Sequence, residues 1–210
     1  MANLLSHLRT SLVATVVFVV ILGGVYPLAV WGIAQVAFPH QANGSLVTKN
    51  GKVVGSELIG QPFSAPGYFH PRPSAAGSGY DATSSGGTNL GPTSDKWING
   101  IHKQTVDGKD DPANFDGVKD LVAAYRLENS LEAAVAVPAD AVTRSASGLD
   151  PHISIANALL QAPRIAKART IDVEKVRGLI AVRTSGPSLG ILGEPGVNVL
   201  ALNLALDELK

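Results

Sequence analysis

Histidine, serine and aspartate are the first residues in this chain that could do chemistry. His70, His102 and His152 could each serve as the general base of a Ser-His-Asp set, which would make the chain a hydrolase. Such an enzyme also needs a nucleophile held on a local motif such as the G-x-S-x-G elbow, and we expect no such motif here. The chain has no Cys, which excludes thiol catalysis, cysteine-ligated zinc and disulfides. We therefore expect no catalytic residue.

A carboxylate and an imidazole stand close together in Asp150-Pro151-His152, which raises the question of a metal site. Two ligands two positions apart do not complete the coordination shell of a metal ion. We expect Asp150 instead to accept hydrogen bonds from backbone amides of a turn that Pro151 stiffens. His152 is then a surface or interface residue, and we predict no metal.

A third kind of chemistry is nucleotide binding. The segment Ser84–Asn89, SSGGTN, is similar to the short Ser-Gly-Gly signature that touches the γ-phosphate in ABC-type ATPases. Glycine allows the backbone to approach a phosphate closely, and successive amides can cradle it. The match is short, and the chain has no Walker lysine. Ser85, Gly86, Gly87 and Asn89 are thus weak candidates for residues near a nucleotide.

The longer loop around this segment, residues 67–97, has the composition of a linker, because Gly, Pro, Ser and Thr dominate it. Large side chains are nevertheless spread through it, which is unusual for a solvated tether. Tyr68, Phe69 and Arg72 are residue types that anchor protein interfaces. We predict an ordered loop that holds or recognises a neighbouring surface.

The part of the chain that precedes this loop begins with a predicted membrane helix. No Lys, Arg, Asp or Glu occurs between Arg9 and Lys49, and residues 11–38 are almost continuously apolar. About 20 apolar residues cross a bilayer, whereas the apolar core of a cleaved signal peptide has about 7–15. We predict a transmembrane helix over 11–38, with residues 1–10 in the cytoplasm and 39–210 forming an extracytoplasmic domain. This orientation follows the bias of Lys and Arg toward the cytoplasmic side.

Behind the span, local patterns predict an α+β domain with long Gly/Pro/Ser-rich loops. Asn50-Gly51 between β-prone runs predicts a β-hairpin, and the apolar spacing from Asp116 to about Ala136 predicts an amphipathic helix capped by Asp116. Val142-Thr143 and Leu189–Leu192 read as short strands.

Three polar residues are predicted helix caps: Ser154, Asp172 with a helix to about Arg183, and Asn198 with a helix through Leu206. The alternation of leucines at positions 200–206 fits a buried strand nearly as well, so both assignments stay open. Pro163 should break or bend the helix that follows Ser154, because an interior proline costs about 3 kcal/mol.

Taken in order, a set of segments resembles the KdpC family, the C subunit of the Kdp-type high-affinity potassium-transporting P-type ATPase. They follow one N-terminal span: GSELIGQPF (55–63), YFHPRPSA (68–75), SSGGTNLGPTS (84–94), SASGLDPHIS (145–154), RIAKAR (164–169) and LGEPGVNVLALNLALD (192–207). The resemblance covers nearly the whole chain except residues 99–136. That stretch looks longer and more helical than the family pattern, and Pro163 departs from it as well.

The resemblance implies a non-catalytic subunit anchored beside a channel-like A subunit, with a P-type ATPase B subunit and a small F subunit as further partners. It also implies a catalytic chaperone role that raises the ATP affinity of the B subunit. No cofactor is then expected on this chain itself, since ATP and potassium act at the level of the complex. Lipid is a further partner. Equal numbers of basic and acidic residues, 17 each, argue against nucleic acid.

Within this hypothesis, Tyr68, Phe69, Arg72, Asn89, Asp150 and His152 are expected to bind a partner or to fix the loops. The predicted orientation places the soluble domain away from cytoplasmic ATP, so any effect on ATP affinity would be indirect. The alternative is a membrane-anchored extracytoplasmic enzyme or ligand-binding domain.

Overall fold

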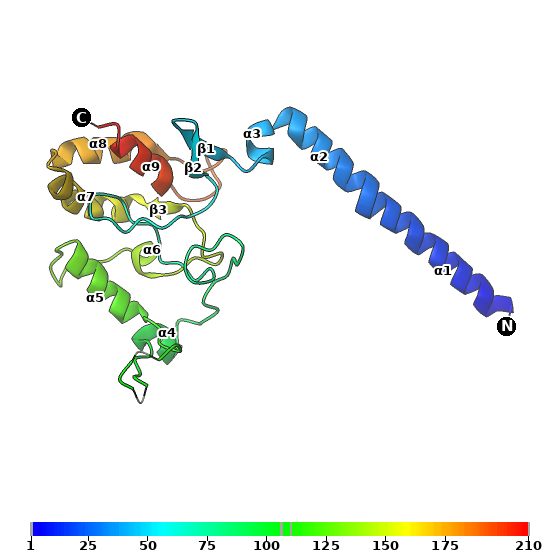
Figure 1. Cartoon of the computed structure of the whole chain (residues 1–210), viewed down its shortest axis with the longest axis horizontal. Coiled ribbons are helices and arrows are strands. Elements are labelled where there is room, and N and C mark those ends of the chain that lie inside the picture. Colours follow the sequence, from blue (N-terminus) through cyan, green and yellow to red (C-terminus); the bar gives the residue numbers. More distant parts are fainter. Residues whose placement is uncertain (1, 106, 110, 210) are drawn as a thin grey trace. The chain divides into compact units, whose positions relative to one another are not determined.

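The computed structural model describes residues 2–105, 107–109 and 111–209, and the chain divides into two compact units, Met1–Ser56 and Glu57–Lys210. Figure 1 shows a long helix and a hairpin in the first unit and a mixed helical and stranded fold in the second. The predicted combination of one N-terminal apolar helix and an α+β domain is confirmed.

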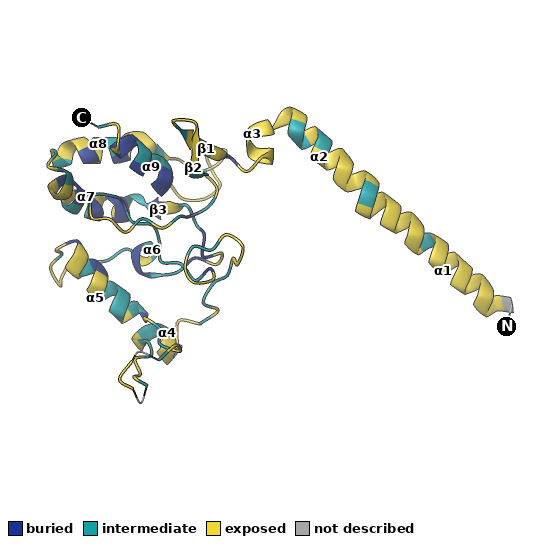
Figure 2. Ribbon diagram, in the orientation of Figure 1, coloured by how far each residue is buried: buried dark blue, intermediate teal, exposed yellow. Residues whose placement is uncertain are grey.

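The first unit begins with a continuous helical rod made of α1 (Ala2–Val20), a π-helical segment (Ile21–Val25) and α2 (Tyr26–Ala37). The candidate membrane-spanning helix Asn3–Ala37 has 35 residues, enough to cross a bilayer at a rise of about 1.5 Å per residue. Its side chains are almost all exposed (Figure 2), which is the opposite of a soluble core helix. The chain therefore has the features of a single-pass membrane protein.

The π-helical segment lies directly before Pro27, and this position has a physical reason. A proline ring collides with the carbonyl of residue i−4, which is Gly23 here, and it supplies no N–H for that carbonyl. One wider turn over Ile21–Val25 separates the proline ring from this carbonyl while the helix continues. Proline therefore leaves the apolar helix unbroken.

After the helix α3 (Pro39–Ala42), the strands β1 (Leu46–Lys49) and β2 (Lys52–Ser56) form an antiparallel hairpin. The two turn residues, Asn50 and Gly51, have φ values of 54° and 74°, as a type I′ turn requires. The predicted hairpin is confirmed. Ser56 Oγ donates to Gly44 O at 2.7 Å, which closes the base of the hairpin.

The second unit has its main core between three helices and a small sheet. The helices are α7 (Ile155–Arg169), α8 (Val173–Arg183) and α9 (Val199–Leu206). The strands β3 (His152–Ser154), β5 (Gly196–Asn198) and β4 (Thr184–Ser185) form an antiparallel sheet in the order β3-β5-β4. The fully buried side chains include Phe69, Ile153, Ile165, Val176, Ile180, Val197, Leu202 and Leu206.

A smaller apolar cluster lies on α5 (Val118–Glu128) and α6 (Ala139–Val142), with Tyr125, Ala141 and Val142 buried. Figure 1 shows α5 and the short α4 (Asp95–Asn99) set apart from α7, α8 and α9. A buried hydrogen bond joins the two clusters, because Tyr125 Oη donates to Asn157 Oδ1 at 2.8 Å.

The three predicted helix caps are confirmed. Ser154, Asp172 and Asn198 each accept a hydrogen bond from a backbone N–H of the first turn that follows, with partners Asn157, Glu174 and Ala201. Of the two open assignments for the last segment, the helix is right and the strand is wrong. Leucines at every second position suggested a strand, but residues on all sides of this helix are apolar and most are buried, so the alternation does not mark one face.

Several other expectations were wrong. The helix predicted over residues 116–136 covers Val118–Glu128, and its cap is Gly117, whose N–H donates to Asp120 Oδ2 at 2.8 Å. Asn129 and the left-handed Ser130 (φ 53°) end it early. Val142 closes the helix α6, and residues 189–192 form a turn bridged between Ser188 and Leu192.

Pro163 does not break α7, which runs from Ile155 to Arg169. The proline is exposed, and so is Leu159, whose carbonyl has no N–H partner at position 163. On the opposite side, Ala158, Ala162 and Ile165 are fully buried on both sides of the proline. Core packing therefore holds the helix together across its weakest turn.

The glycine-rich loop is fixed to α9 through one amide side chain. Asn203, buried at 1% exposure, accepts the Phe69 N–H at 2.8 Å through Oδ1 and donates to Phe69 O at 2.9 Å through Nδ2. Phe69 itself is fully buried, so both of its backbone groups would lack water if Asn203 were absent.

We expect Asn203→Ala to destabilise the second unit by about 2–4 kcal/mol, since it leaves a buried donor and a buried acceptor unpaired. Urea unfolding of the full chain in detergent, followed by circular dichroism, measures this. The control is Asn99→Ala, which removes an exposed side chain from α4 and should cost less than about 0.5 kcal/mol. Equal losses in the two variants would contradict the importance of the Asn203 clamp.

Candidate functional site

Arg72, Asp150, His152 and the segment Ser85–Gly87 lie where two loops of the second unit meet, whereas Tyr68, Phe69 and Asn89 lie outside this region. We call this region the loop junction, and it comprises residues 72–87 and 143–152. Arg72 Nη1 donates to Asp150 Oδ2 at 2.8 Å, which joins positions 78 residues apart. The other oxygen of Asp150 accepts the His152 N–H at 3.0 Å, so Asp150 fixes a turn on one side and a guanidinium on the other. The His152 ring is exposed at the edge of this pair.

A serine holds the centre of the loop junction. Ser74 Oγ donates to Gly148 O at 2.6 Å and accepts the N–H groups of Ala76 and Tyr80 at 3.1 and 2.8 Å. Tyr80 Oη in turn donates to Arg72 O at 2.7 Å, and burial raises the pKa of Tyr80 to about 12. The tyrosine is therefore a neutral hydrogen-bond donor at any physiological pH.

The Gly/Ser segment lies against the second loop through its backbone. Gly86 N–H and Ser85 Oγ both donate to Ser147 O, each at 2.9 Å. A Cβ on Gly87 would lie 2.9 Å from Ala146 O, so only glycine fits there. Asn89 is exposed and has left-handed backbone (φ 53°). In a phosphate-binding loop the glycine amide would point to the anion, whereas the Gly86 amide bonds to protein here.

Tyr68 and its neighbours fasten the start of the loop to the ends of α7 and α9. Tyr68 Oη donates to Asp207 Oδ1 at 3.0 Å, and the Arg169 guanidinium packs 4.6 Å from the centre of the Tyr68 ring. Arg169 also donates to Gly67 O at 2.6 Å and to Asp207 at 2.8 Å. These contacts combine a cation–π interaction with charge-assisted hydrogen bonds.

His70 lies between a carbonyl and a carboxylate. Its Nε2 is 3.1 Å from Ala65 O and its Nδ1 is 2.7 Å from Glu128 Oε1, so both ring nitrogens face acceptors. The backbone of His70 is paired to Gln161, which accepts at 2.7 Å and donates at 3.1 Å. The hydrogen bond from His70 lowers the pKa of Glu128 and keeps it ionised.

An apolar cleft of about 430 Å³ lies beside this pair, between the two clusters of the core. Three prolines (62, 71 and 73) and the aromatic residues Phe63, Tyr80 and Tyr125 line it. Besides the two tyrosines, its titratable groups are His70 and Glu128, whose side chains are bonded to each other.

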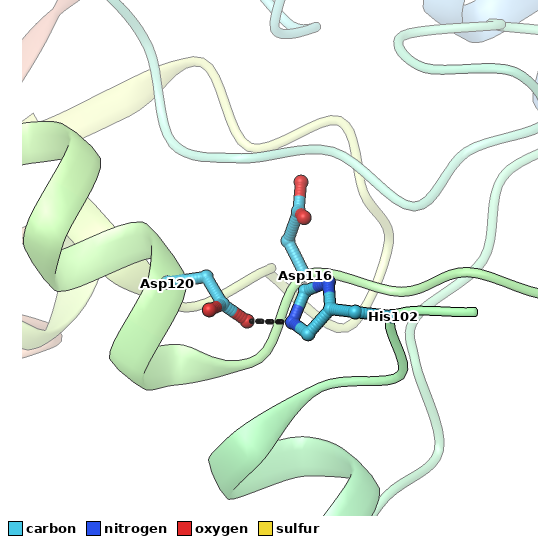
Figure 3. Close-up of side chains that lie close together, drawn as sticks. All are labelled: His102, Asp116 and Asp120. Atoms are coloured by element: carbon cyan, nitrogen blue, oxygen red, sulfur yellow. Dashed lines mark hydrogen bonds and ion pairs between the residues drawn. The ribbon is translucent and has the colours of Figure 1, made fainter. Parts of the chain in front are cut away.

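His102, Asp116 and Asp120 also lie close together, with ligand atoms within 4.8 Å of one another. Figure 3 shows Asp120 bonded to His102, at 3.0 Å, and the Asp116 carboxylate directed away from this pair. The Gly117 amide is the main reason that the pKa of Asp120 is lowered. Arg144, 4.4 Å from the Phe115 ring, adds a cation nearby. Helix capping accounts for this cluster.

One motif was overlooked in the sequence, because Gly186-Pro187-Ser188-Leu189-Gly190 has the G-x-S-x-G spacing. The structure does not form a nucleophile elbow there. An elbow joins a strand to a helix, whereas this segment leads from β4 to β5, and the Ser188 backbone pairs with Leu192.

Comparison with known proteins shows the family of this chain. The family described as "K+-transporting ATPase, c chain" matches residues 8–208. The chain belongs to the KdpC family. Curated relatives are named "Potassium-transporting ATPase KdpC subunit". One from Mycobacterium tuberculosis (strain ATCC 25618 / H37Rv) is 52% identical over 203 residues, which is 97% of this chain and 98% of the relative.

Two further KdpC relatives show the same extent of similarity. The protein from Caulobacter vibrioides (strain NA1000 / CB15N) is 53% identical over 205 residues, covering 97% of this chain and 94% of the relative. The protein from Acidobacterium capsulatum is 50% identical over 205 residues, covering 98% and 100%. The similarity thus extends through the membrane helix and the residues 99–136 that the sequence motifs left out.

Sequence reasoning did not single out the KdpC residues that hold the loop from the helical side. They are Gln161, Arg164, Arg169, Asn203 and Asp207. A signal was present, because a polar residue such as Asn203 within the apolar run LALNLAL must find a partner when it is buried. The sequence alone does not say which backbone groups it pairs with.

Gly148 is the point where the loop junction tolerates least change. It has a φ of 68°, and a Cβ there would lie 2.6 Å from Gly86 O and 2.7 Å from Ala76 N. We expect Gly148→Ala to lower the free energy of unfolding by about 1 kcal/mol from the left-handed backbone and by a further 1–3 kcal/mol, roughly, from the collision.

Urea unfolding of the full chain measures this loss, and Gly190→Ala is its matched control. Gly190 has a φ of 78° but nothing within 4 Å of an added Cβ, so only the backbone effect should appear. If the two variants lose the same stability, the close contact between the loops is not real.

Proposed function

We propose that this chain is the non-catalytic C subunit of an ATP-driven potassium uptake complex. The observation that carries the proposal is membership of the KdpC family over residues 8–208. The KdpC relatives are named as subunits of a potassium-transporting ATPase. In this proposal the partners are a channel-like A subunit, an ATP-hydrolysing B subunit and a small F subunit, with lipid around the single helix.

The geometry of the loops supports a role in recognition. Arg72, Ser74 and Asp150 are bonded within the chain and hold two loops in one shape. A surface prepared in this way loses little conformational entropy when it docks. Tyr68, Asn89 and His152, which lie at the margin of these loops, are the side chains that we assign to partner contact or loop fixing.

The proposed orientation has the N-terminus in the cytoplasm and the unit Glu57–Lys210 outside the membrane. Arg9 and the terminal amine precede the apolar helix, and no Lys or Arg follows it before Lys49. Potassium would then meet the complex on the side where this unit lies.

We infer that any rise in the ATP affinity of the B subunit is indirect. The unit would act outside the membrane by stabilising one conformation of the assembled complex more than another. The hydrogen bond from the Gly86 N–H to Ser147 O supports this inference, because an amide engaged within the chain is not directed at a phosphate. ATP and potassium then bind elsewhere in the complex.

We predict that the tagged full chain, solubilised in mild detergent, co-purifies with a polytopic channel-like chain and an ATP-hydrolysing chain. Complex prepared without this chain should need more ATP for half-maximal hydrolysis. Recovery of the chain by itself, with hydrolysis of esters or peptides, would instead support the membrane-anchored enzyme or ligand-binding domain.

Orientation can be tested by cysteine labelling, because the chain has no cysteine of its own. Leu127, 84% exposed on α5, is a better site than Ser74, whose hydroxyl is engaged in the loop junction. We expect Leu127→Cys to react with an impermeant maleimide on intact cells, and Asn3→Cys to react only after lysis. The reverse pattern would place the second unit in the cytoplasm.

A further inference from the structure

The segment between β4 and β5 exposes large aliphatic side chains to solvent. We call residues 186–195 the apolar loop. Leu189 is 90% exposed, Ile191 83% and Leu192 58%, and no charged residue lies between Arg183 and Glu194. Apolar side chains gathered at one exposed point are the usual mark of a contact surface, since single exposed leucines need no explanation but a cluster does.

The backbone of the apolar loop holds these side chains outward. Ser188 N donates to Leu192 O at 2.8 Å and Leu192 N donates to Ser188 O at 2.9 Å, which closes a tight turn. Leu189 has left-handed backbone with a φ of 54°, a conformation that leucine rarely adopts. An unfavourable backbone at a leucine that buries nothing within the chain indicates a use outside it.

The base of the apolar loop lies where the chain enters the second unit. Ser185 and Gly196 are paired across β4 and β5, so they define the base. Two residues further, Asn198 Nδ2 donates to Glu57 O at 2.8 Å. Glu57 is the first residue of the second unit. The loop therefore starts beside the residue that follows directly from the membrane helix and hairpin.

The link from the apolar helix to Glu57 is short. Leu46 and Ser56 are paired across the hairpin, so the last residue of the hairpin lies beside its first. The effective link is the path from Ala37 to Leu46, which includes the helix α3. At no more than about 3.6 Å per residue, this path reaches about 30 Å, or less where it is helical. Glu57 is thereby confined to the neighbourhood of the bilayer surface.

We propose that the apolar loop is a second membrane contact of this chain. Leu189, Ile191 and Leu192 insert at the boundary between headgroups and acyl chains of the bilayer that the N-terminal helix spans. Residues 184–193 offer aliphatic surface without charge, which suits lipid, and the base of the loop lies next to the tethered end of the unit. The proposal rests on the membrane anchorage stated above and is independent of the potassium complex.

The test uses the full chain alone in vesicles of phosphatidylcholine and phosphatidylglycerol. An environment-sensitive fluorophore is attached to Ile191→Cys, and to Leu127→Cys as the control with matched exposure, 83% against 84%. We expect the Ile191 probe to emit at shorter wavelength than the control and to be quenched by a nitroxide on the lipid acyl chain. The Leu127 probe should be quenched by aqueous iodide instead.

Leu192→Cys provides a second labelled position, so a disturbance by one label does not decide the result. Flotation with the vesicles confirms that the chain is anchored in each sample. If anchored Ile191 and Leu192 probes are as open to iodide as the control, the proposal is wrong. Shielding that appears only after channel-like or ATPase subunits are added also overturns it, because the loop then binds protein. The vesicles contain no partner subunit, so these results do not bear on co-purification.

Discussion

The pairing of the Asn203 amide with both backbone groups of Phe69 is the constraint on which the second unit depends. It fixes the glycine-rich loop to the most buried helix, and the Phe69 ring enters the main core at the same point. Next to it, Gln161 makes the same two-way contact with the backbone of His70. With two successive residues held by helix side chains, the loop has a set position before it reaches Arg72 and the loop junction.

This arrangement explains how a segment with the composition of a linker can be ordered. Glycine and proline give the loop turns that other residues would resist, and they contribute little packing of their own. The order comes from long polar side chains on α7 and α9 that reach across to loop carbonyls, such as Arg164 to Tyr68 O and Arg169 to Gly67 O. A KdpC chain built this way presents a rigid surface from loops, with its helices serving as the support.

The histidine and carboxylate residues that the sequence first suggested as catalytic or metal-binding candidates make structural contacts. Asp150 and His152 share a turn, Asp120 caps a helix and contacts His102, and His70 bonds to Glu128. The carboxylates of Asp150, Asp120 and Glu128 and the rings of His70 and His102 are each engaged by a neighbour in the chain, whereas the His152 ring is exposed. The apolar loop differs from these groups, because its large aliphatic side chains are exposed to solvent.

The sequence by itself determined the features that depend on neighbours along the chain. Hydropathy set the membrane helix, Asn50-Gly51 set the hairpin, and Ser154, Asp172 and Asn198 set three helix starts, because each works within one or two turns of backbone. Only the tertiary structure decided that Pro163 stays inside a continuous helix, since buried residues on both sides of it supply the packing. It also decided the partners of Arg72 and Asn203, which lie 78 and 134 residues away along the chain. Pairings across such distances follow from how the core assembles, and no local pattern encodes them.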